Sequence, residues 1–84
     1  GNELSRQTFL QHLCFLFEVA AEVNHRGLGY EMVCAMLNFK DKPYFKEMVD
    51  RTGQSPVVKK IFREFLNMYM ETENPSGNSK LVNI

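Results

Sequence analysis

The sequence predicts an all-α protein, a compact orthogonal bundle of about four helices. Apolar residues recur at the three- and four-residue spacing of helices through most of the chain. Ser, Pro and Gly residues stand where these stretches begin and end. Nowhere does strict alternation of apolar and polar residues continue long enough to indicate a strand. With 84 residues the chain can form one domain but not two.

The first helix is predicted for residues 8–23, with Ser5 as its N-cap and Gly27 as a stop beyond its C-terminus. At about 100° per residue, its polar side chains occupy one narrow stripe and apolar side chains occupy nearly all the rest. We therefore expect a central helix that is covered on several sides. The polar stripe consists of Gln7, Gln11, Glu18, Glu22 and His25.

Phe15 lies at the edge of this polar stripe, on the far side of the helix from Phe17. The simpler interpretation is that Phe15 packs against another helix of the same domain, and the alternative is that it faces a partner. Val19 and Tyr30 are also left over once one internal face has been filled. Phe15, Val19 and Tyr30 are therefore the candidate partner-binding residues.

A short, mostly apolar second helix is predicted for residues 31–38, after a turn at residues 28–30. The third helix is predicted to restart at Pro43, with Asp41 capping its free N–H groups, and to run to about Arg51. Gly53 is suited to a left-handed cap at its end.

The fourth helix has the clearest start in the chain, because Ser55 is followed by Pro56 and proline is favoured in the first turn of a helix. Its apolar face continues to about Glu71. We expect the long first and fourth helices to pack together, with the short pair filling one end of the bundle. Residues 5–72 then form the domain, residues 1–4 are a tag scar or flexible N-terminus, and residues 73–84 are a flexible, polar tail.

Composition limits the classes of function. Ten Lys and Arg residues balance ten Asp and Glu residues, so no overall charge attracts nucleic acid or an anionic membrane. No signal peptide or membrane span is visible. Cys14 and Cys34, the only cysteines, lie in apolar runs, which favours free thiols and a nuclear or cytoplasmic location. The alternative is one disulfide between the first two helices of a secreted domain.

The residues that commonly perform catalysis are few and separated. His12 and Cys14 point about 200° apart on one helix, so they cannot form a nucleophile and base pair. Cys34 lies in an apolar run, where a thiol is unreactive. The chain has no Cys-x-x-Cys pair, no His pair at metal-ligand spacing and no glycine-rich phosphate loop. We expect no enzyme activity, cofactor, metal or small-molecule substrate.

The segment between Phe45 and Phe65 resembles a helix-turn-helix, a motif used to bind DNA. In that interpretation Lys59, Lys60 and Arg63 contact phosphates. An ordinary helix corner with a solvated basic face is favoured instead, because the domain is neutral and Lys59 stands where the motif usually has an apolar residue.

A neutral helical domain rich in Met and Phe is best suited to binding another protein or a second copy of itself through an apolar surface. The sequence therefore predicts a non-catalytic interaction domain of a larger intracellular protein, an adaptor or dimerisation module. Nucleic-acid binding through the helix-turn-helix is the alternative.

Overall fold

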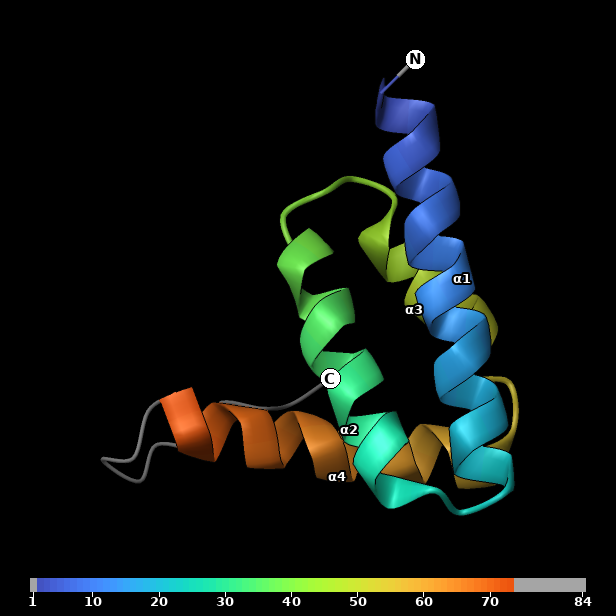
Figure 1. Cartoon of the computed structure of the whole chain (residues 1–84), viewed down its shortest axis with the longest axis vertical. Helices are drawn as coiled ribbons and strands as arrows, with labels where there is room; N and C mark the ends of the chain where they lie inside the picture. Colours follow the sequence, from blue (N-terminus) through green and yellow to red (C-terminus); the bar gives the residue numbers. More distant parts are fainter. Residues whose placement is uncertain (1, 74–84) are drawn as a thin grey trace.

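The computed structural model describes residues 2–73, and its elements confirm an all-α bundle (Figure 1). The first and last helices of the chain are long and the two between them are shorter, and a single 3-10 turn follows the second helix. The elements are α1 (Asn2–Glu22), α2 (Arg26–Met36), η1 (Leu37–Phe39), α3 (Phe45–Thr52) and α4 (Pro56–Glu73). The predictions for residues 74–84 lie outside the described residues.

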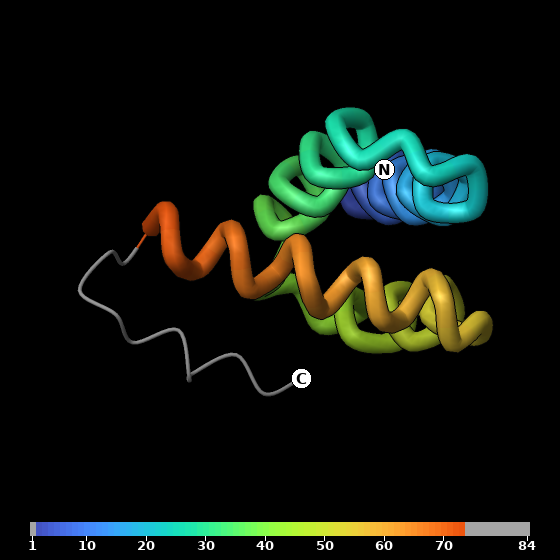
Figure 2. Tube along the Cα trace, turned by 90° about the horizontal axis from the view of Figure 1, so that it is seen from below, coloured from blue at the N-terminus to red at the C-terminus, as the bar shows by residue number. Residues whose placement is uncertain are grey.

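The helices form two layers that cross at a steep angle. α1 and α2 run side by side in opposite directions, and α4 crosses behind them near the end where they are joined (Figure 1). Seen from below, α1 and α2 lie above α3 and α4 (Figure 2). α1 packs on α4 as expected, through Phe17 against Phe62 and Phe65, but its main partner is α2. The short α1–α2 connection explains this, because it folds α2 directly back on α1.

α1 is longer than predicted at its start and ends before the expected stop. It begins at Asn2, so Ser5 lies inside the helix and is not its N-cap, and residues 2–4 are helical. Asn24 ends it with a left-handed backbone of φ 59°, while the His25 N–H donates to the Ala20 carbonyl at 2.8 Å. Asparagine, and not Gly27, therefore provides the left-handed residue.

α2 contains the three residues predicted as a turn. His25 caps it, because its Nδ1 accepts a hydrogen bond from the Leu28 N–H at 3.2 Å. Gly29 is buried in this helix, where it touches the ring of Phe65. Its role is close packing of α2 on α4, and the sequence pattern mistook that glycine for a helix breaker.

The two helices α3 and α4 are present as predicted, but the predicted caps of α3 are not formed. α3 starts after Tyr44, which makes no side-chain capping bond, so Asp41 and Pro43 lie in the preceding turn. Gly53 has a φ of −82°, so the predicted left-handed cap is wrong. Pro56 opens α4 as predicted.

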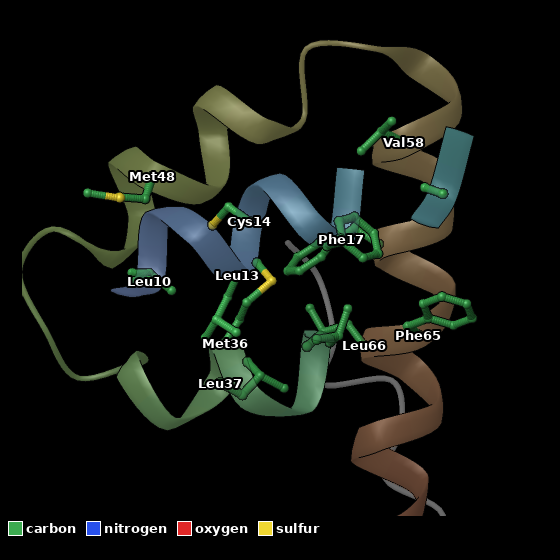
Figure 3. Close-up of a cluster of buried hydrophobic side chains, with 13 residues drawn as sticks. Leu10, Leu13, Cys14, Phe17, Met36, Leu37, Met48, Val58, Phe65 and Leu66 are labelled. Carbon is green, nitrogen blue, oxygen red and sulfur yellow. The ribbon is translucent and has the colours of Figure 1, made fainter. Parts of the chain in front are cut away.

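The core lies where α1, α2 and α4 meet (Figure 3). Phe17 is completely buried, and its ring packs in a T-shaped arrangement with Phe62 at 5.7 Å and with Phe65 at 6.3 Å between centroids. Thr52 is the buried polar residue of the described part, and its hydroxyl donates to the Met48 carbonyl at 3.0 Å. The other core residues include Leu10, Leu13, Cys14, Val33, Met36, Val58 and Leu66.

None of the described helices is both long enough and apolar enough to cross a membrane.

Candidate interaction surface

α1 carries a face of exposed apolar side chains, which we call the outer face. Within residues 2–73, eight large hydrophobic side chains are exposed; five of them belong to α1, and a sixth directly follows its last residue. They are Leu4, Phe9, Phe15, Leu16, Val19 and Val23, of which the last lies just beyond the end of the helix.

The position of α1 at the edge of the bundle explains the exposure. Its buried residues all lie on one side at 100° per residue, and α2, α3 and α4 all pack there. In both views α1 stands at an edge, with no described helix over its opposite side (Figures 1 and 2). At the margin of that side, the Phe9 ring meets the Phe39 ring of η1 at 6.1 Å between centroids. α1 contacts all three other α-helices, as expected of a central helix, but they all lie on one side of it. The expectation that α1 is covered on several sides is therefore wrong: it is apolar on nearly all sides but buried on one.

The outer face is also poor in charge. No Lys, Arg, Asp or Glu occurs between Gln7 and Phe17, and Glu22 is the carboxylate nearest the C-terminal end of the face. The exposed sides of α3 and α4 differ, because they carry ion pairs at ordinary surface spacing. These pairs are Lys46 with Asp50 at 2.8 Å, Arg51 with Glu47 at 3.0 Å and Lys60 with Glu64 at 2.8 Å.

Two of the three predicted partner-binding residues lie on this face. Phe15 is 61% exposed and Val19 is 41% exposed, so the interpretation of Phe15 as a core residue is wrong. Tyr30 does not belong to the face, because it is half-buried and its ring meets Phe65 edge-on at 5.9 Å. Tyr30 completes the packing of α2 on α4.

The remaining members of the face were missed by sequence reasoning. Phe9, Leu16 and Val23 belong to the apolar circumference that was expected to be covered, because the pattern does not tell which apolar side of a helix is covered. Leu4 was placed outside the helix altogether. The absence of charge between Gln7 and Phe17 was the available signal, since an exposed helix side normally carries charged residues.

The basic residues of the helix-turn-helix interpretation are exposed on α4. Lys60 forms an ion pair with Glu64, and Glu64 forms a second ion pair with Arg26 at 3.2 Å. The hydrogen bond from Lys60, and then that from Arg26, lowers the pKa of the Glu64 carboxyl. Lys59 and Arg63 form no ion pair within the described residues.

Lys59 and Arg63 are exposed and line a cavity of about 280 Å³, to which α1, α2, α3 and α4 all contribute. Its floor is apolar, formed by the core residues Phe17, Val58 and Phe62 among others. Two cations and an apolar wall meet at this cavity. Its lining also includes the Asp50 carboxylate, which is paired with Lys46, and the Thr52 hydroxyl, which donates to the Met48 carbonyl.

The groups considered for catalysis remain apart. Both cysteines are free, so the alternative disulfide is not formed. Cys14 is buried beside Thr52, and burial raises the pKa of its thiol. No group of three or more potential metal ligands gathers anywhere in the searched part of the chain, residues 2–73.

Comparison with protein-family models, with curated proteins and with solved structures gives no match for this chain.

Proposed function

We propose that this chain is a non-catalytic interaction domain of an intracellular protein, an adaptor or dimerisation module that binds an apolar helix through the outer face of α1. The observation that carries the proposal is the exposure of six large apolar side chains along one side of α1 and at the residue that follows it, where residues 7–17 carry no formal charge.

The size of the face supports a specific interface. A fully buried aromatic side chain removes about 150 to 250 Å² from water, so the 54% of Phe9 and 61% of Phe15 that are exposed amount to roughly 170 to 290 Å². With the four aliphatic side chains the face reaches on the order of 600 Å², the upper end of what a monomeric protein usually exposes in one patch. Patches of this size normally mark a binding site.

The arrangement of the side chains favours a helix as the bound element. Phe9, Leu16 and Val23 follow one another at seven-residue intervals, and Val19 falls between the last two. Helix recognition uses anchors at such three-, four- and seven-residue spacings, because they align along one side of each helix.

A photo-crosslinking residue at Phe15 tests this proposal in cells that make the full chain. Benzoylphenylalanine resembles phenylalanine in shape, and the 61% exposure of Phe15 leaves room for it. We expect covalent adducts, whether to another protein or to a second copy, and we expect their loss when Val19→Glu is added. The same residue at Val57, which is 58% exposed on α4, is the matched control and should give none. Absence of adducts at both Phe15 and Leu16 would overturn the proposal.

Nucleic-acid binding through α3 and α4 is the second candidate, supported by Lys59 and Arg63, whose charges are not paired within residues 2–73. The acidic Glu64 and Glu71 on the same exposed side of α4 weaken the electrostatic attraction to phosphate. If this candidate is correct, added salt must lower the affinity for duplex DNA steeply, and Lys60→Glu must lower it further. Affinity that resists both changes would eliminate it.

A further inference from the structure

We infer that the occupant of the outer face of α1 is the same face of a second copy of this chain, lying antiparallel across a two-fold axis near Phe15. The inference rests on the proposed function and specifies its partner.

The spacing of the outer face is that of a two-helix seam. Phe9, His12, Leu16, Val19 and Val23 follow one another at alternating intervals of three and four residues. This repeat defines positions a and d of a coiled coil, where side chains of one helix insert between those of another. Four of the five are exposed apolar residues and His12 is an exposed polar one.

The chemistry of the face makes a second copy a suitable occupant. A two-fold interface requires a surface that is complementary to itself, and a charged surface meets its own charge in such a pair. The eleven residues from Gln7 to Phe17 have no formal charge, and the net charge of the chain is zero. Neither local nor overall repulsion therefore opposes pairing of two copies.

The area also matches the requirement of a small dimer. Each partner of a stable complex contributes about 800 Å² of surface. The six exposed side chains supply at most on the order of 600 Å² of this as apolar surface, with Leu4 outside the a, d and g positions. His12, Thr8 and Gln11 lie exposed among them and add polar surface. The covering helices α2, α3 and α4 pack on the buried side of α1 and so leave the outer face open to another molecule (Figure 2).

The distribution of charge along α1 favours the antiparallel direction. Glu18 and Glu22 lie near its C-terminus, and the last turn contains no basic residue. A parallel pair would place these carboxylates together beside the negative ends of two helix dipoles. An antiparallel pair separates the two sets of carboxylates and opposes the two dipoles.

The antiparallel repeat fixes a register. Because a positions face d positions of the second copy, Phe9 meets Val19, and Leu16 meets His12. Position g faces position g of the second copy across the two-fold axis, and Phe15 is the central g residue. The two Phe15 rings therefore lie side by side at the centre of the dimer.

Sedimentation equilibrium of the full chain tests the stoichiometry. We expect a mass of twice 9.8 kDa at tens of micromolar, independent of added salt. Val19→Glu should weaken the association at least tenfold. Val57→Glu makes the same change at an exposed valine on α4 and should leave it unaltered. Far-ultraviolet circular dichroism of both variants confirms that the fold is retained.

Two cysteine variants test the direction. In a Cys14→Ala, Cys34→Ala background, Phe15→Cys should oxidise to a covalent dimer and Val23→Cys should not, because antiparallel packing separates the two copies of residue 23. The opposite pattern would show a parallel pair and overturn the proposed geometry.

The outcomes also separate this inference from the proposed function. A mass of one chain at all concentrations, with adducts from Phe15 to another protein, overturns the dimer and leaves the interaction domain. A mass of one chain without adducts overturns both.

Discussion

Gly29 of α2 lies so close to the ring of Phe65 on α4 that a β-carbon on it would stand 2.8 Å from the nearest ring carbon. Phe65 cannot withdraw, because it is 1% exposed and its ring is also in contact with Phe17 and Tyr30. The pair sets the distance between these two helices.

Gly29→Ala should therefore lower the free energy of unfolding. Forced overpacking in a filled core costs about 1 to 3 kcal/mol, which exceeds the gain of up to about 1 kcal/mol from alanine in a helix. Gly27→Ala, in the same helix with its nearest neighbouring atom at 3.9 Å, should instead be stabilising by a few tenths to 1 kcal/mol. Urea unfolding measures the change in unfolding free energy for the two variants. Equal changes would contradict the proposed clash between a β-carbon at residue 29 and the Phe65 ring.

Phe15 and Phe17 are expected to differ strongly although they are two residues apart. Phe17→Ala should cost about 3 to 5 kcal/mol, because it leaves a cavity between Phe62 and Phe65. Phe15→Ala should change stability by less than about 0.5 kcal/mol at protein concentrations where the chain is monomeric. Thermal and urea unfolding at low micromolar concentration distinguish them, and a large loss from Phe15→Ala would mean that this ring is covered within one chain.

The two thiols should differ in reactivity. Only the thiolate reacts with iodoacetamide, and burial both shields Cys14 and raises the pKa of its thiol. Half-buried Cys34 should be alkylated first in the native protein, and Cys14 only as the fold opens. Mass spectrometry of digested samples, taken at intervals at pH 8, assigns the order.

The Cys14 thiol should also make the free energy of unfolding depend on pH in the alkaline range. Its pKa in the folded protein lies above the unfolded value of about 8.5. The stability that the protonated thiol contributes is therefore complete below about pH 8.5 and is lost as pH rises through the folded pKa. Cys14→Ala should flatten the decline in unfolding free energy between pH 8 and pH 10. An unchanged decline would show that Cys14 is not its source.

The lowered pKa of Glu64 should make the free energy of unfolding depend on pH in the acid range. Its pKa is lowered by the hydrogen bond from Lys60 and, next, by that from Arg26. The carboxylate therefore contributes stability above its unfolded pKa of about 4.3, and this contribution is lost as pH falls through the lower, folded value. Glu64→Gln should reduce the loss of stability between pH 5 and pH 3, whereas Glu71→Gln on the same helix should not. Equal curves for both variants would argue against the two ion pairs.

His12 is the polar member of the proposed seam, and we expect His12→Leu to tighten self-association at least tenfold. Leucine is favoured at a d position, while the imidazole must give up water there. Asn67→Leu adds the same side chain to an exposed position on α4 and should not change the dissociation constant. Sedimentation velocity over a dilution series measures the dissociation constants of the two variants. Weaker association of His12→Leu would show that His12 is not part of the dimer interface.

The sequence predicted the helical class and the start of α4 because these depend on local features, namely periodicity and the Ser-Pro pair. The start of α2 was missed because Gly29 has a tertiary role, close contact with Phe65, that no local pattern reveals. The outer face was recovered only in part for a related reason. Apolar periodicity identifies every side of α1 that avoids water, but the choice of the covered side depends on where α2 and α4 pack.

The apolar circumference of α1 also has a consequence for how the gene tolerates change. Substitutions on the two sides of this helix should be tolerated differently, depending on whether folding or assembly is selected. A saturation library selected for soluble, folded protein should accept polar residues at Phe15, Val19 and Val23 and reject them at Leu10 and Phe17. A library selected for assembly should reject both sets, which would leave α1 the least variable helix of the domain.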